Sequence, residues 1–270
     1  ISKVEGLLEV TQNKTQIIVT AGSDTRKYDG TELVYNKYSC SQAPVDGDEL
    51  VVMVAGSITD VGSVENEVTS VKVMRGSKDV TDSYSGIHTE DGRLTVTKRD
   101  VILTSASDSK EYDGTPLTNG LVTVSGDGFA KGEGAAYDVT GSQTFARSSD
   151  NTFTYELNQG TKADNYNVIE ELGRLTVTAT DRAIVVIADN AEKKYDGTPL
   201  TMDNFTYTGK LADGDELVVT VEGTITNAGT QDNKITDVKV MHGSIEVTDS
   251  YSKISRRKGT LKVTKRNVTL

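Results

Sequence analysis

The sequence has little of what a large single-core protein uses. Its 270 residues include no tryptophan, three prolines and one cysteine, and aromatic residues make up 6% of the chain. With only 35% hydrophobic residues, one thick core is not expected, whereas several thin sandwiches are. The lone Cys40 cannot form an internal disulfide. No apolar run approaches the roughly 18 residues of a membrane-spanning helix, so membrane insertion is not expected.

The chain also lacks basic clusters. Its 40 acidic residues outnumber 29 lysines and arginines, giving a formal net charge of −11 and a pI near 4.8. An acidic surface repels phosphate backbones and anionic lipid headgroups, so nucleic acid is not an expected partner.

What the sequence does contain is an internal repeat. The segment Lys27–Thr31 reads Lys-Tyr-Asp-Gly-Thr and returns at Glu111–Thr115 and Lys194–Thr198, so that the tyrosines recur at intervals of 84 and 83 residues. Units one and three align without a gap at an offset of 167 residues. A second signature, Gly-x-Leu-x-Val-Thr, closes each unit at 92–97, 173–178 and 259–264.

These signatures divide the chain. We predict repeat 1 at 13–98, repeat 2 at 99–180 and repeat 3 at 181–265, joined by short basic segments without glycine or proline. Residues 1–12 contain Gly-Leu-Leu-Glu-Val-Thr and read as the closing strand of a preceding repeat, and 266–270 read as the start of the next. Such joints favour restricted hinges and an elongated rod.

The hydrophobic pattern has a period of two. Leu94 and Val96, like their counterparts in the other repeats, alternate with polar residues, which predicts a half-buried antiparallel closing strand. Tyr84, Tyr166 and Tyr251 each follow an Asp-x pair, and their position suits a tyrosine whose hydroxyl bonds back to the backbone. We therefore predict an all-β chain, a tandem array of three small Ig-like β-sandwiches, with β-grasp-like units as the alternative.

The combination of an opening strand, Tyr-Asp-Gly-Thr-Pro-Leu and the closing signature resembles the YDGT-type or MBG-like repeats of bacterial surface proteins. Repeat 1 departs from it, with Glu32 where the others have Pro116 and Pro199. The resemblance implies an extracellular, cell-wall-anchored protein of Gram-positive bacteria, of stalk or adhesin type. It implies no particular ligand.

Few residues suggest chemistry. The Tyr-Asp-Gly-Thr motif reads as a tight turn, with Asp capping amides, Gly at positive φ and Tyr packing, because structural turns recur in every repeat. Candidate Ca²⁺ ligands in two acidic turns compete with the reading of plain exposed turns, since repeat 2 has Lys131-Gly132-Glu133 there and the EF-hand spacing is absent. These candidates are Asp46, Asp48, Asp213 and Asp215.

Neither catalysis nor a cofactor is expected. The histidines His88 and His242 do not recur between repeats, and Cys40 aligns with Tyr207. The leading hypothesis is a structural spacer whose partners are neighbouring repeats of the same chain. The alternative is an adhesin module that binds host mucin, glycan or matrix protein through side chains outside the repeat pattern; the candidates are Phe129, Tyr35 and Tyr38.

Overall fold

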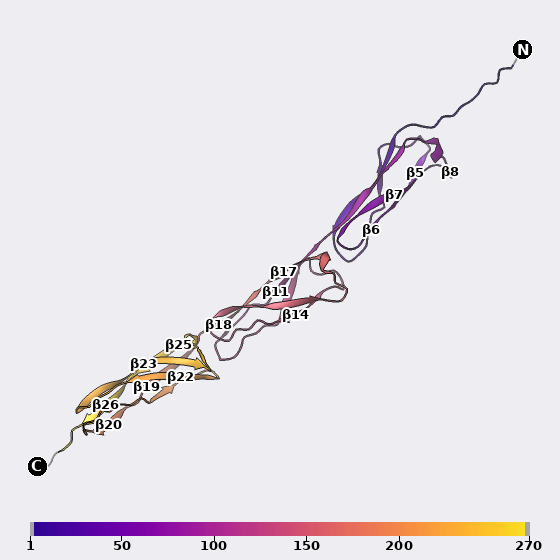
Figure 1. Ribbon diagram of the computed structural model, residues 1–270. Coiled ribbons are helices and arrows are strands. Elements are labelled where there is room, and N and C mark those ends of the chain that lie inside the picture. The colour runs from indigo at the N-terminus through magenta and orange to yellow at the C-terminus, as the bar shows by residue number, and fades with distance from the viewer. Residues whose placement is uncertain (1–2, 268–270) are drawn as a thin grey trace. The chain divides into compact units, whose positions relative to one another are not determined.

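A computed structural model describes residues 3–267, and strands dominate them (Figure 1). Strands account for 57% of the chain and helix for 3%, which confirms the all-β prediction. The helical elements among the described residues are three-residue 3₁₀ turns, and none is long and apolar enough to cross a membrane. These turns are η1 (Thr81–Ser83), η2 (Ala163–Asn165) and η3 (Thr248–Ser250).

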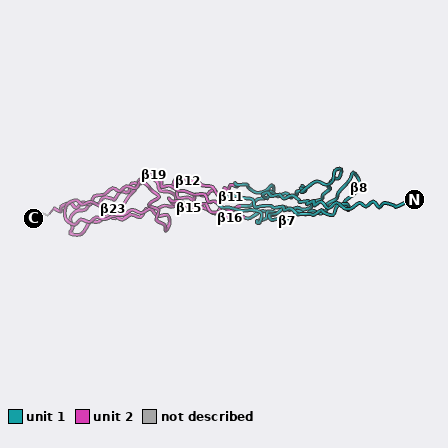
Figure 2. Tube along the Cα trace, turned by 90° about the horizontal axis from the view of Figure 1, so that it is seen from above, with its two compact units in different colours: residues 1–103, 124–136, 156–170 teal, residues 104–123, 137–155, 171–270 magenta. Residues whose placement is uncertain are grey.

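The chain forms two compact units (Figure 2). Unit 1 contains residues 1–103, 124–136 and 156–170, and unit 2 contains 104–123, 137–155 and 171–270. Repeat 2 thus supplies segments to both units. Unit 1 holds the contacts between repeats 1 and 2, and unit 2 holds those between repeats 2 and 3.

Repeat 1 packs two sheets face to face. The opening strand β1 (Ile17–Ala21) lies in the centre of a β4-β1-β9 sheet, and the chain then changes sheet to form β2 (Asp24–Lys27) in the order β2-β10-β7-β5. Side chains of β1 pack against the long strand β7 (Gly62–Arg75). The other strands are β3 (Leu33–Val34), β4 (Tyr38–Cys40), β5 (Glu49–Ala55), β6 (Ser57–Ile58), β8 (Lys78–Asp79), β9 (Ile87–Glu90) and β10 (Gly92–Thr97).

Repeat 3 repeats this arrangement. Its sheets run β21-β19-β25 and β20-β26-β23-β22, with β24 paired to β23. The strands are β19 (Thr180–Ala188), β20 (Ala191–Lys194), β21 (Phe205–Thr208), β22 (Asp215–Glu222), β23 (Gly229–His242), β24 (Ile245–Glu246), β25 (Tyr251–Arg257) and β26 (Gly259–Thr264).

Repeat 2 differs where its sequence drifts. The position of the 14-residue strands β7 and β23 is taken by two shorter strands, and the sheets run β13-β11-β17, β12-β18-β15 and β14-β16. The strands are β11 (Arg99–Ser105), β12 (Asp108–Glu111), β13 (Val122–Gly126), β14 (Ala135–Val139), β15 (Ser148–Asn151), β16 (Phe153–Leu157), β17 (Tyr166–Glu171) and β18 (Gly173–Thr178).

The closing strand corrects one prediction. Its apolar residues are buried as expected, with Leu94 0% and Val96 2% exposed, but its pairing is mixed. β10 runs antiparallel to β7 on one side and parallel to β2 on the other, and β18 and β26 pair in the same way. In repeats 1 and 3 the opening strand also pairs in parallel with the penultimate strand, β1 with β9 and β19 with β25, so the first two strands of the repeat lie beside the last two.

A close backbone crossing explains the glycine that begins the closing signature. A Cβ atom on Gly259 would lie 2.4 Å from the carbonyl oxygen of Asp189, and on Gly173 it would lie 2.3 Å from that of Ser105. Real Cβ atoms do not approach so closely, so only glycine lets the closing strand cross the bend between the two halves of the opening strand. Gly92 has the same contact in repeat 1.

Each repeat also buries an asparagine at an equivalent position that the sequence analysis did not single out. The Asn233 amide nitrogen donates to the carbonyl oxygens of Asp189, at 3.0 Å, and Met202, at 2.8 Å, from a side chain with 0% exposure. It thereby satisfies one backbone acceptor at the bend after β19 and a second one in the segment that leads to β21. Asn66 and Asn151 make the equivalent pairs of bonds in repeats 1 and 2.

The N-terminal segment is not part of either sheet of repeat 1. Residues 3–12 form no strand (Figure 1), and Leu7, Leu8 and Val10 are more than nine-tenths exposed. Their identification as the closing strand of a preceding repeat stays a prediction, as do the repeat boundaries. Of the predicted start of a fourth repeat, 268–270 lie outside the described residues.

Candidate functional site

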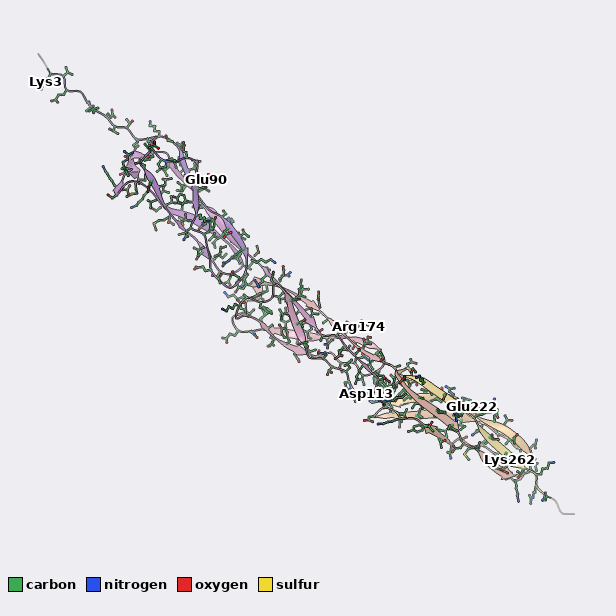
Figure 3. All side chains as sticks on the ribbon, turned by 180° about the vertical axis from the view of Figure 1, so that it is seen from behind. Lys3, Glu90, Asp113, Arg174, Glu222 and Lys262 are labelled. Atoms are coloured by element: carbon green, nitrogen blue, oxygen red, sulfur yellow. The ribbon has the colours of Figure 1, made fainter. Side chains whose placement is uncertain are left out.

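The Tyr-Asp-Gly-Thr motif forms a tight turn, as predicted. One carboxylate oxygen of Asp29 accepts hydrogen bonds from the Thr31 amide, at 2.9 Å, and the Thr31 hydroxyl, at 2.7 Å. Gly30 takes a φ of 80°, where glycine alone is free of strain. The other two turns, at Asp113 (labelled in Figure 3) and Asp196, have the same bonds.

A cation two residues before each tyrosine holds the turn. The Lys110 ammonium lies 2.8 Å from an Asp113 carboxylate oxygen, and the Lys193 ammonium lies 2.9 Å from that of Asp196. Lys110, followed by the Thr115 bonds, lowers the pKa of Asp113 to about 2. The pKa of Asp196 is lowered in the same way, first by Lys193. The turn is therefore a preorganised element that presents its tyrosine to the next repeat.

In unit 1 this tyrosine binds a carboxylate of repeat 2. The Tyr28 hydroxyl donates to one Glu133 oxygen at 2.5 Å, and the Tyr166 hydroxyl donates to the other at 2.7 Å. Tyr166 also accepts from the Ala130 amide at 3.0 Å, and its ring meets that of Tyr28 edge to face with centroids 5.6 Å apart. We call Tyr28, Glu133 and Tyr166 junction 1.

In unit 2 the next tyrosine repeats the contact, in what we call junction 2: Tyr112, Asp215 and Tyr251. The Tyr112 hydroxyl lies 2.9 Å from both Asp215 oxygens, and the Tyr251 hydroxyl donates to one of them at 2.7 Å. The two rings again meet edge to face, at 5.7 Å. His242 adds a contact at 2.7 Å from its Nδ1 to an Asp215 oxygen.

Both junctions are buried. Tyr28 is 5% and Tyr112 1% exposed, whereas Tyr195, in the same turn of repeat 3, is 40% exposed. In unit 2, Tyr112 belongs to one continuous apolar cluster with Leu175 of repeat 2 and Val240 of repeat 3. The tyrosine therefore extends the core of one repeat into the core of the next.

A second contact accompanies each tyrosine. In unit 1 the Asn165 side chain, at the end of η2, accepts from the Val61 amide and donates to Asp60, each at 2.9 Å. In unit 2 the Ser250 hydroxyl, at the end of η3, accepts from the Ala146 amide at 3.2 Å. Two separate points of attachment restrict rotation at a junction more than one alone.

Junction 1 also carries charge pairs. The Lys27 ammonium lies 2.6 Å from an Asp127 oxygen and 3.4 Å from an Asp100 oxygen. The Arg99 guanidinium donates to the carbonyl oxygens of Tyr28, Asp127 and Gly128. Lys27 of β2 and Arg99 of the joint thus both bind across the junction, Arg99 through the Tyr28 carbonyl oxygen. The ion pairs are half exposed, so they contribute little on their own.

The tyrosine hydroxyls stay protonated to high pH. Burial, and then the hydrogen bond to Glu133, raises the pKa of Tyr28 to about 12. Burial also raises the pKa of Tyr166 to about 12, and it raises the pKa values of Tyr112 and Tyr251. Protonated phenols are donors, which is what a carboxylate between two rings requires.

The predicted tie between the recurring second tyrosine and the backbone is confirmed. The hydroxyls of Tyr84, Tyr166 and Tyr251 accept from the amides of Val45, Ala130 and Ala212. The amide lies 36 to 39 residues upstream, in the turn that carries the carboxylate. Each of these hydroxyls therefore ties two parts of its own repeat together, and those of Tyr166 and Tyr251 also bond the junction carboxylate.

The candidate calcium ligands are divided. Asp46 and Asp213 are exposed, whereas the Asp48 and Asp215 side chains are 4% and 0% exposed and their oxygens accept from tyrosines. Among residues 3–267 no group of three His, Cys, Asp or Glu side chains is placed to hold a metal ion.

The three candidate ligand-binding aromatics differ in position. Phe129 is half-buried, and its ring packs edge to face on Tyr166 at 5.1 Å, beside junction 1. Tyr35 is also half-buried, over Gly22. Tyr38 is 40% exposed on β4, and its hydroxyl lies 3.3 Å from the Leu50 carbonyl oxygen. Cys40, on the same strand, is a free and exposed thiol.

Sequence reasoning missed the acceptor of the junction. Glu133 aligns with Asp48 and Asp215. In the sequence, this change from aspartate to glutamate was an argument against a calcium site. What the three positions share is a carboxylate one residue after a glycine, followed by a tyrosine 33 to 36 residues later. That spacing was the available signal.

Comparison with known proteins adds little. No family model matches the chain, and no curated protein matches it. Among solved structures, Drosophila N-cadherin EC1-3 is 8% identical over 96% of this chain and 99% of that one, with a TM-score of 0.25. The I9-I11 tandem of titin is 10% identical over 93% of this chain and 100% of that one, with a TM-score of 0.22. TM-scores this low do not establish a common fold.

Proposed function

We propose that this chain is a spacer segment of a cell-wall-anchored bacterial surface protein, part of an adhesin, in which the tyrosine junctions stiffen a run of repeats. The observation that carries the proposal is the recurrence of one contact in both units. In each, the turn tyrosine of one repeat is buried against a tyrosine and a carboxylate of the next.

The chemistry suits a spacer. Hydrogen bonds to a charged acceptor contribute roughly 1.5–3 kcal/mol when buried, and an edge-to-face aromatic pair adds about 0.5–1.5 kcal/mol. Three residues in each repeat, the turn tyrosine, the carboxylate and the second tyrosine, are enough to propagate such a joint along an array. Repeats joined in this way keep a fixed spacing without a specialised linker.

The proposed location follows from the sequence. The repeats resemble those of Gram-positive surface proteins, the single cysteine demands no pairing, and the acidic charge of −11 suits a soluble exterior segment. The proposal assigns the chain no catalytic role and no cofactor.

The second candidate function is an adhesin module that binds mucin, glycan or matrix protein. The observation that favours it is Tyr38, 40% exposed on β4, because exposed aromatic side chains are what a glycan stacks on. Phe129 is a poorer candidate, since its ring already packs on Tyr166.

A binding assay separates the two functions. The purified chain is applied to immobilised mucin, matrix proteins and a glycan array, with calcium and with chelator. The spacer function predicts no saturable binding. Saturable binding that Tyr38→Ala abolishes, with Tyr207→Ala as the exposed control in repeat 3, would establish the adhesin module instead.

A further inference from the structure

The penultimate strand of each repeat lies at the edge of a sheet. β9 in repeat 1, β17 in repeat 2 and β25 in repeat 3 each pair with the opening strand alone. Among the described residues, no strand pairs with the other side of any of the three. Each edge therefore presents backbone donors and acceptors that another strand could use.

The charge on this edge changes sign in repeat 3. At the two positions before the glycine of the closing signature, repeat 1 has Glu90 and Asp91, whereas repeat 3 has Arg257 and Lys258. All four residues are exposed. Repeats 1 and 3 align without a gap and their sheets run in the same order, so the same edge has opposite charge in the two repeats.

Glu90 and Arg257 occupy equivalent places on the outer face of the edge. Glu90 pairs with Thr20 and Arg257 with Ile187, and both partners alternate with buried residues of the opening strand. The Glu90 carboxylate (labelled in Figure 3) accepts from the Thr20 hydroxyl at 3.0 Å and keeps its exposure.

Arg257 is the cation of this edge that repeat 3 does not itself engage. Its neighbour Arg256 donates to the Thr236 carbonyl oxygen at 2.9 Å, and Lys258 lies 2.9 Å from an Asp232 oxygen. Among the residues that the structure describes, the Arg257 guanidinium has no hydrogen-bond or ion-pair partner of this kind. It is therefore free to bind an acidic group from outside the repeat.

Edges of one charge sign keep copies of a chain apart. Like charges directly opposite each other destabilise a strand pair, and charged side chains commonly protect an edge against pairing with another edge. Two acidic edges, or two basic ones, are protected in this way. A basic edge beside an acidic edge is not, because opposite charges across a strand pair are stabilising.

We infer that β25 of repeat 3 pairs edge to edge with β9 of a second copy of this chain, with the charges of Arg257 and Lys258 set against those of Glu90 and Asp91. The backbone groups of the two edges supply the attachment, and the charges select the edge. The inference goes beyond the proposed function and does not depend on the tyrosine junctions.

β17 fits β25 less well than β9 does. It ends in Glu170 and Glu171, but Leu172, 48% exposed, follows them where repeat 1 has the charge of Asp91. It also belongs to the repeat whose sheets differ from those of repeat 3. The acidic edge that matches β25 in surroundings and opposes it in charge at both positions is β9.

The net charge of −11 does not prevent two copies from meeting. At an ionic strength of about 0.15 M, exposed charges more than about 8 Å apart are largely screened. The charges that lie against each other at the paired edges therefore outweigh those on the rest of the two surfaces.

Sedimentation velocity on the full chain, with a reductant to keep Cys40 free, tests the inference at concentrations up to about 1 mM. The wild-type chain is expected to gain mass with concentration at an ionic strength of about 0.15 M. It should lose most of that gain at about 1 M, where charges are screened beyond about 3 Å. Glu90→Arg and Arg257→Glu should each weaken association at least about tenfold.

Two further charge reversals are the matched controls. Glu171→Arg makes the change of Glu90→Arg at the equivalent place on β17, and Lys210→Glu changes an exposed loop residue of repeat 3. Both should leave association unchanged. Loss of association in Glu171→Arg, with none in Glu90→Arg, would make β17 the acidic partner and overturn the inference.

Combining the two reversals gives the sharpest outcome. A chain with both Glu90→Arg and Arg257→Glu has the two signs exchanged, so its association should return to within about threefold of the wild type. An equal mixture of the two single variants should also associate, since each supplies the sign that the other lacks. Misfolding of a single variant could produce neither recovery.

Failure of this recovery, or a wild-type chain that stays monomeric throughout, would overturn the inference. So would a monomeric chain that binds polyphosphate through Arg257, because the basic edge would then serve an anionic polymer. None of these results bears on the tyrosine junctions, which lie within one chain.

Discussion

The Tyr112 hydroxyl lies 2.9 Å from both carboxylate oxygens of Asp215, a residue 103 positions further along the chain. The Tyr28 hydroxyl makes the corresponding contact with one carboxylate oxygen of Glu133, 105 positions further along. A motif that reads locally as a turn thus acts at long range. The function of the motif depends on the carboxylate and the tyrosine that its own tyrosine contacts in the next repeat.

Tyr112→Ala should lower the free energy of unfolding of unit 2 by about 3 kcal/mol, because it removes a buried aromatic side chain and leaves Asp215 without one donor. Tyr195→Ala is the matched control, since Tyr195 occupies the same turn and is 40% exposed; it should change stability by less than about 0.5 kcal/mol. Denaturant unfolding monitored by circular dichroism measures both. Equal effects of the two variants would contradict the junction.

Asn233→Asp should destabilise repeat 3 more than Asn233→Ala. Alanine leaves two backbone carbonyl oxygens without donors, at about 1–3 kcal/mol, whereas aspartate adds a buried carboxylate among acceptors. The measurement is thermal unfolding at neutral pH, with Asn227→Ala, at an exposed bend of repeat 3, as control. If both Asn233 variants were as stable as the wild type, the asparagine would have no structural role.

Gly173→Ala should destabilise repeat 2 by about 2 kcal/mol or more, because its Cβ would lie 2.3 Å from the Ser105 carbonyl oxygen. Gly120→Ala, in the same repeat, meets no atom within 4 Å and should be tolerated. Thermal unfolding of the two variants compares a glycine at a close backbone crossing with a glycine that has open space around it. Tolerance of Gly173→Ala would mean that the strands do not cross so closely.

Junction 1 should open in alkali. Its tyrosines hold their protons more tightly when closed, since the pKa values of Tyr28 and Tyr166 rise from 10.0 to about 12. Their contribution to stability is therefore complete below about pH 10 and is lost as the pH rises through about 12. The tyrosinate absorbance, recorded as a function of pH, should show a group of phenols that titrate well above pH 10. Tyr28→Phe should remove one phenol from this group. A single transition near pH 10 for all tyrosines would refute this.

Much of the fold could be predicted from the sequence because period-two patterning and the repeat signatures are local. The buried Leu94 and Val96 and the turn at Asp29 and Gly30 follow from neighbouring residues alone. The parallel pairing of the first two strands with the last two does not, since alternation is the same in either direction. Asp48, Glu133 and Asp215 look like exposed turn residues in sequence, and only the arrival of a tyrosine from another repeat or strand buries them.

The central claim is that a turn tyrosine fixes one repeat against the next, and spin-label distance measurement across junction 2 tests it most directly. Labels at Asp138→Cys and Asp237→Cys, both exposed strand positions in unit 2, in a Cys40→Ser background, should give one narrow distance distribution. Tyr112→Ala should broaden it, whereas Tyr195→Ala should not. An equally narrow distribution in Tyr112→Ala, or a broad one in the parent, would contradict the claim.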